Sequence, residues 1–231
     1  MSPDLAAVDV LIDGQRAVAA LPFKSASPYT QIPAGTRSVR VTPAGQGGNA
    51  VLSADVPLQA GQSLTLVAVG RPPELSALPL QDDNAAPPAG KAKVRFVHTS
   101  PDAPPVDIAV RGGPTIFPNV GFKSVAGYVT VDAGTYALDV RPAGTSSVAL
   151  SVPGVILQSG QIVTFFGAGL LNANTLSAVA IDYTVAAGPR VGTGGPYAVD
   201  PAVPSWSAGA AVLAAIALVA GVGALRRRHN R

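Results

Sequence analysis

Few residues in this chain could support chemistry, and most of them lie in one short motif that occurs twice. The motif Ser-Pro-Asp-x-x-x-Val-Asp places carboxylates five residues apart, as Asp4 and Asp9 in one copy and as Asp102 and Asp107 in the other. Loop carboxylates are ligands for Ca²⁺, and they also cap turns by accepting backbone hydrogen bonds. The spacing is not that of an EF-hand loop, so both interpretations stay open, with turn capping favoured.

A catalytic role for these loops is not favoured. The 231-residue chain has no cysteine, which excludes disulfides, thiolate metal sites and cysteine nucleophiles. His98 adjoins the motif, whereas the other histidine, His229, lies in the basic tail, so no pair of histidines can form within one body. A G-x-S-x-G turn and a phosphate-binding loop are also missing from the sequence. We therefore predict a protein that is not an enzyme and has no catalytic, cofactor or metal site.

The loops that carry the motif are candidate binding loops, through Ser100, Asp102, Asp107, Asp4 and Asp9. A second recurring feature is the FKS triplet, which places Lys24 and Lys123 in the same context. Such a lysine could form a covalent cross-link to Asn or Asp, but a lysine at a strand edge explains it more simply.

An internal repeat positions these residues. Phe23-Lys24-Ser25 matches Phe122-Lys123-Ser124, and Leu58-Gln59 matches Leu157-Gln158, within an ordered series at offsets of 98 to 101 residues. The series predicts two homologous modules, residues 1–81 and 92–184, joined by a Pro/Ala-rich linker at 82–91.

Short apolar or alternating runs fill each module, and Gly, Pro, Asn or Asp separates them. This rhythm predicts an all-β fold of two tandem antiparallel β-sandwiches, Ig-like or transthyretin-like. A strand at residues 93–99 precedes the motif in the second module, whereas only Met1 precedes it in the first. We expect Met1 to be an internal or mis-assigned start with a strand and a secretory signal upstream. The alternative is that the strand is lost and that the sister module or a partner covers the edge.

At these residues the sequence resembles the DUF4397 domain of bacterial surface and secreted proteins. The resemblance lies in VRFVHTSPDAPPVDIAV (94–110), the F-K-S-x-x-x-Y step, AGTYALDVRPAG (133–144) and LQSGQIVTFFGAG (157–169). It implies a β-sandwich module that is often in tandem and often exported. It carries over no catalytic residue and no ligand.

The C-terminal part of the chain predicts a membrane anchor. Residues 185–204 form a Pro/Gly-rich spacer, and 205–225 contain no charged residue, which suits a single transmembrane helix in the lipid bilayer. The basic tail 226–231 begins with Arg226, Arg227 and Arg228, which would stop transfer on the cytoplasmic side. The N-terminal residues do not form a signal peptide, so the alternative is a tail-anchored protein with a cytoplasmic body.

The charge distribution excludes nucleic acid as a partner. The net charge is +3, but four of the 16 basic residues lie in the tail, so residues 1–225 hold 12 basic against 13 acidic groups, a net charge of −1. The sequence therefore predicts a cell-membrane protein with an extracytoplasmic body, acting as a surface binding or adhesion module toward a protein or glycan. The alternatives are an architectural envelope protein whose modules self-associate or act as spacers, and an accessory domain of a larger surface enzyme.

Overall fold

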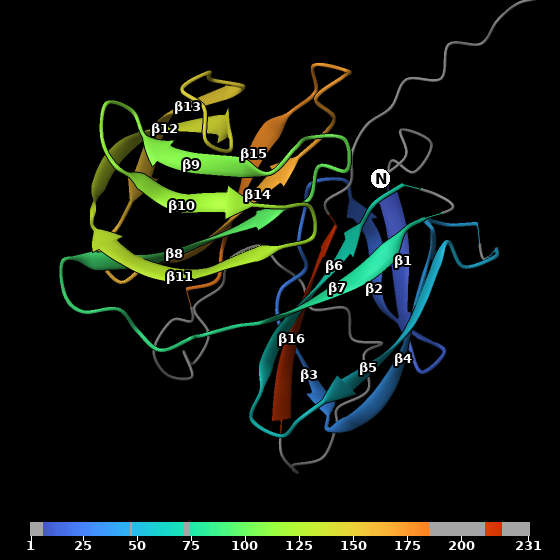
Figure 1. Ribbon diagram of the computed structural model, residues 1–231. Helices are drawn as coiled ribbons and strands as arrows, with labels where there is room; N and C mark the ends of the chain where they lie inside the picture. Colours follow the sequence, from blue (N-terminus) through green and yellow to red (C-terminus); the bar gives the residue numbers. More distant parts are fainter. Residues whose placement is uncertain (1–6, 47, 72–73, 185–210, 219–231) are drawn as a thin grey trace, which may run out of the picture.

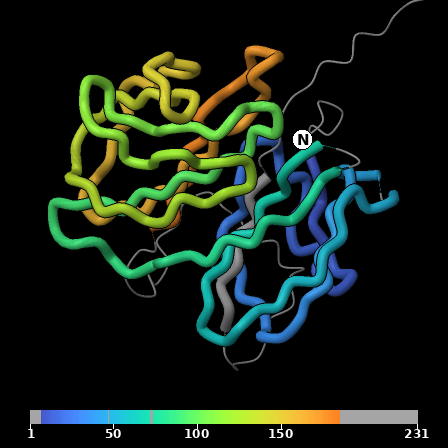
Figure 2. The backbone as a smooth tube through the Cα atoms, viewed as in Figure 1, coloured from blue at the N-terminus to red at the C-terminus, as the bar shows by residue number. Residues whose placement is uncertain are grey.

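The computed structural model describes residues 7–46, 48–71 and 74–184, and the backbone of 211–218. The described residues form strands and turns and contain no helix, which confirms the predicted all-β class. They build two lobes that lie side by side, and residues 82–90 lead from one lobe to the other (Figures 1 and 2).

The first module contains the strands β1 (Ala7–Ile12), β2 (Gln15–Pro22), β3 (Thr30–Pro33), β4 (Gly35–Pro43), β5 (Leu52–Leu58), β6 (Ser63–Val69), β7 (Ser76–Gln81) and β16 (Ala211–Leu218). The second module contains β8 (Lys91–His98), β9 (Val106–Val110), β10 (Thr115–Val120), β11 (Val125–Asp132), β12 (Gly134–Pro142), β13 (Leu150–Leu157), β14 (Ile162–Ala168) and β15 (Ser177–Asp182).

Both modules consist of two four-stranded sheets with the same strand order. The outer sheets run β2-β1-β4-β5 and β10-β9-β12-β13, and the inner sheets run β3-β16-β6-β7 and β11-β8-β14-β15. Strand β16 of the first module therefore holds the position that β8 holds in the second.

The four sheets form a stack with three apolar layers. Val10 and Leu66 belong to the layer inside the first module, and Phe96 and Ile108 to the layer inside the second. A third layer, which includes Val67, Val97 and Phe166, lies between the two inner sheets. The inner strands β6 and β14 are thus covered on both faces, which explains why their sequences are almost continuously apolar and do not alternate.

A buried polar network joins the two modules beside the third layer. The Arg95 guanidinium pairs with the Asp82 carboxylate, and its Nε donates to Thr164 Oγ1 at 2.7 Å. Tyr29 and Thr65 of the first module donate their hydroxyls to Asp82 Oδ2 at 2.8 and 2.7 Å. Burial first, and then the Asp82 carboxylate, raise the pKa of Tyr29, so this hydroxyl stays protonated and remains a donor.

The structure differs from the sequence-based prediction within residues 205–225. There the described backbone is strand β16, where the sequence predicts the middle of a transmembrane helix. The rest of 185–231, including the spacer and the proposed stop at 226–228, lies outside the described residues. The described residues contain no helix that is long and apolar enough to cross a membrane. A strand in a sheet covered on both faces can have an uninterrupted apolar sequence, as a membrane helix does, so the pattern fits either structure.

Candidate functional site

The motif of the second module follows β8 at one end of the sandwich. The Asp102 carboxylate accepts hydrogen bonds from the backbone N–H groups of Leu171 and Asn172, at 2.9 and 3.0 Å, and from Ser100 Oγ at 3.2 Å. Burial raises the pKa of Asp102, but these hydrogen bonds outweigh burial and hold the pKa below its ordinary value. Asp102 thus fastens the motif loop to the loop that joins β14 and β15.

His98, Ser100 and Asp102 are neighbours, but their hydrogen bonds do not form a proton relay. The Ser100 N–H donates to His98 Nδ1 at 3.3 Å, so the ring proton lies on Nε2, which is 3.1 Å from the Pro104 carbonyl oxygen. The Ser100 hydroxyl donates to Asp102 and not to the ring. His98 and Ser100 are 2% and 1% exposed, and burial lowers the pKa of His98. Both ring nitrogens are therefore engaged in holding the loop.

Asp9 and Asp107 occupy equivalent places in the two modules. Asp9 accepts backbone N–H hydrogen bonds from Ala20 at 2.8 Å and Gly45 at 3.4 Å. Asp107 accepts them from Asn119 at 2.7 Å and Gly144 at 2.9 Å. These bonds, led by the ones from Ala20 and Asn119, lower the pKa of both carboxylates.

Ala20 and Asn119 have positive φ angles of 48° and 51°, so each aspartate stabilises an unusual bend in the neighbouring strand. Asp4 lies outside the described residues. Within the described part of the chain no three His, Asp or Glu side chains gather in an arrangement that could hold a metal ion.

A concave feature of the second module lies elsewhere, between the edge strands β13 and β15. We call it the edge groove. Its volume is about 310 Å³, and it is lined by Val152, Val155, Ile156, Leu157, Gln161, Val163, Phe165, Ala178, Ala180 and Asp182. Most of the lining is aliphatic, while Gln161 and Asp182 form a polar rim, with Gln161 Nε2 donating to Asp182 Oδ2 at 2.7 Å.

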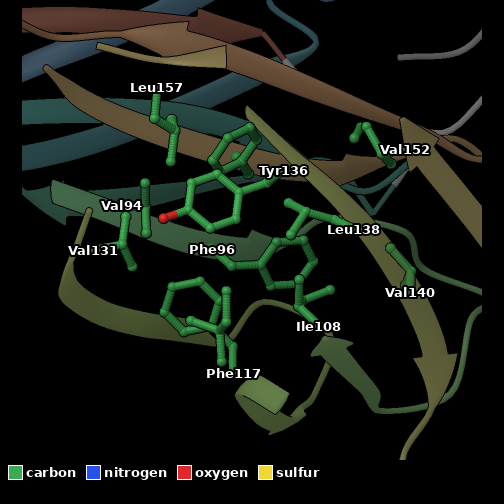
Figure 3. A pocket seen from close by; sticks show the side chains of 13 residues that line it. Val94, Phe96, Ile108, Phe117, Val131, Tyr136, Leu138, Val140, Val152 and Leu157 are labelled. Carbon is green, nitrogen blue, oxygen red and sulfur yellow. The ribbon is translucent and has the colours of Figure 1, made fainter. Parts of the chain in front are cut away.

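The edge groove adjoins two small cavities in the core of the module. A cavity of about 30 Å³ shares Val152, Leu157, Phe165 and Ala178 with the groove. Figure 3 shows Val152 and Leu157 around this cavity, together with Phe96, Tyr136 and Leu138. A second cavity of about 70 Å³ shares Ala178 and reaches His98 and Ser100 beside the motif loop. The groove and the two cavities are thus neighbours that share lining residues, between the strand edge and the motif loop.

One extra residue in β13 accounts for the opening. Tyr136 of β12 pairs with Val155, but Leu138 pairs with Val152, so β13 contains one residue more than its partner between these pairs. This is a β-bulge, and Gly154 in it has a φ of 69°. The corresponding pair β4 and β5 is regular from Gly35 opposite Leu58 onward.

The first module is closed at the equivalent place. Strand β5 contacts β7 there. Its inward residues Leu52, Val56 and Leu58 are buried, whereas Val152 and Val155 of β13 are half-buried. A cavity of about 20 Å³ lies in the core of this module.

Sequence reasoning missed the edge groove. The signal was present as a difference in length, because LSADVPLQ at 52–59 corresponds to LSVPGVILQ at 150–158. A glycine added within a strand is a known sign of a bulge.

Parts of the chain are similar to a known protein family and to a solved structure. Residues 1–109 match the family model of DUF4397, a domain of unknown function. The DUF4397 match covers the first module as far as β7, the linker, β8, the motif loop and β9 except for its last residue. Among solved structures, the C-terminal domain of AlgF from P. aeruginosa is similar, at 19% identity and a TM-score of 0.32, over 40% of this chain and 98% of that chain. The curated proteins give no match.

Proposed function

We propose that the protein is a non-catalytic binding protein whose second module takes the aliphatic part of a small ligand into the edge groove. The observation that supports this is the aliphatic lining of the groove at the open strand edge, which adjoins two apolar cavities in the core. A volume of about 310 Å³ is at the lower end of the range of about 300–1,000 Å³ that small-molecule sites occupy.

The lining indicates the chemistry of the ligand. Val152, Phe165 and Ala178 suit an alkyl chain or an aliphatic ring system. The Asp182 carboxylate at the rim disfavours an anionic head group and favours a neutral or cationic one. The proposal is therefore an amphipathic molecule with an aliphatic tail and an uncharged polar head, as a glycan-bearing lipid has.

Octyl glucoside, used below its micelle concentration, is a suitable probe. We expect it to bind the purified chain, and octanoate to bind more weakly because its carboxylate lies beside Asp182. The variant Ala178→Leu fills the junction of the groove and both cavities and should weaken binding at least about tenfold, or ~1.4 kcal/mol. Ala77→Leu, at the equivalent position of the closed first module, is the matched control and should leave binding unchanged. Equal losses in both variants, or no binding by the intact chain, would contradict the proposal.

The location of the protein is part of the proposal and depends on sequence alone. We propose an extracytoplasmic body; anchoring through 205–225 as a single membrane span, with 226–231 inside the cell, requires that residues 211–218 leave strand β16. That residues 92–184 are a second copy of the DUF4397 domain is likewise proposed, and the identical strand order of the two modules supports it.

A second candidate function is architectural, and one observation favours it. Strand β13 is an edge strand, and its Ile156 is 67% exposed. An exposed apolar edge can pair with another copy. Sedimentation of the purified chain tests this, because self-association that Ile156→Lys abolishes would support the architectural role, and a monomer at high concentration would exclude it.

A further inference from the structure

The position between β3 and β6 receives its strand from a distant part of the chain. Strand β16 pairs antiparallel with β3 and parallel with β6, and its Leu213 lies opposite both Gln31 and Ser63. In the second module β8 fills the same position with the same directions, antiparallel to β11 and parallel to β14. In that module, however, the strand comes directly before the rest of the sandwich.

Without a strand between β3 and β6, the first module would lose free energy of folding. Strands β3 and β6 would each expose unpaired backbone N–H and C=O groups inside a sheet that has an apolar layer on each face. Residues 211–218, with the sequence AVLAAIAL, carry no polar side chain, which suits a strand within such a sheet.

We propose that the position between β3 and β6 is a strand-acceptor site and that residues 211–218 of the same chain are its occupant. Main-chain hydrogen bonds on both sides hold the strand, as in other cases of strand addition. A segment held in this sheet cannot span a bilayer at the same time. Closure of the first module and anchoring through 205–225 therefore exclude each other.

The absence of cysteine from the chain allows a direct test by disulfide trapping in the full-length protein, in membranes and in the soluble fraction. Directly opposed residues of antiparallel strands have neighbouring Cβ atoms at a separation that a disulfide can bridge. The double variant Gln31→Cys with Leu213→Cys should therefore form an intramolecular disulfide on mild oxidation. The matched control is Gln31→Cys with Ala214→Cys, which should not, because the next residue along the strand faces the other side of the sheet.

Three other outcomes would each contradict the proposal that residues 211–218 of the same chain occupy the position between β3 and β6. A disulfide between two chains would make a second copy the occupant. Failure to cross-link, with the thiol at position 213 shielded from a membrane-impermeant reagent, would place the segment in the bilayer. Failure with a reactive thiol would mean that the segment occupies neither site.

A proline substitution gives an independent readout. Ala215 lies opposite Thr65 of β6, and proline in a central strand removes a ladder hydrogen bond, whereas transmembrane helices tolerate proline. Ala215→Pro should therefore accelerate amide hydrogen exchange in β6 by at least tenfold, while Ala208→Pro leaves it unchanged. Unchanged exchange in both variants would contradict the proposal.

Discussion

The two modules share one strand order but differ at two places, the central strand of the inner sheet and the far edge of the sandwich. The first module receives β16 from the C-terminal part of the chain and is closed where β5 contacts β7. The second uses its own β8 and is open between β13 and β15. One topology can therefore give a closed body or an open groove, depending on a single added residue in an edge strand.

The largest expected effect comes from the ion pair that couples the modules. Arg95 lies opposite Thr164 in β14, whereas Ala215 holds the corresponding register position opposite Thr65 in β6. Arg95→Ala would leave the buried Asp82 carboxylate without its partner and should lower the free energy of unfolding by about 3–5 kcal/mol. Urea unfolding of the full chain measures this.

The control is the double variant Arg95→Met with Asp82→Asn, which removes both charges, keeps an acceptor for the Tyr29 and Thr65 hydroxyls and should recover part of the loss. A single variant as stable as the intact chain would show that the pair does not couple the modules.

A smaller effect on stability is expected at a position where β14 has glycine and β6 has alanine. Gly167 and Ala68 hold corresponding positions, and a Cβ added at Gly167 would lie 2.9 Å from Phe96 Cζ. Gly167→Ala should destabilise the chain by about 1–3 kcal/mol through overpacking. Ala68→Gly in the first module should cost only about 0.5–1 kcal/mol, the usual effect of glycine in a strand. Thermal unfolding of both variants measures this. A larger loss of stability in Ala68→Gly than in Gly167→Ala would contradict the prediction.

The smallest expected effect is a pH dependence of the stability between pH 7 and pH 5. It should arise in the second module, since His98 is the only histidine among the described residues. Burial lowers the pKa of His98 in the folded protein below its ordinary value of 6.5. The unfolded chain therefore binds more protons below that pH, and stability should fall as the pH drops from 6.5 toward the folded pKa. His98→Gln should flatten the dependence of the melting temperature between pH 7 and pH 5. If the melting temperature of His98→Gln depended on pH as steeply as that of the intact chain, His98 would not be the source of the pH dependence.

Alternation and turn residues were enough to predict the all-β class, because each strand between its turns is set by local sequence. The apolar run at 211–218 could not be assigned, since a central strand and a membrane helix can have the same apolar composition. The aspartates of the motif were predicted as candidate binding groups, but their partners, such as Leu171 for Asp102, lie up to 70 residues away. The edge groove depends on how Gly154 pairs across the sheet, which the sequence records only as one extra residue.

We propose that the bulge at Gly154 opens a ligand groove in the second module alone. The most direct measurement is octyl glucoside binding, by calorimetry, to the intact chain and to a variant in which Gly154 is deleted. Deletion gives β13 the length of β5 and should abolish binding while the chain stays folded. Equal binding by the folded deletion variant would contradict the account.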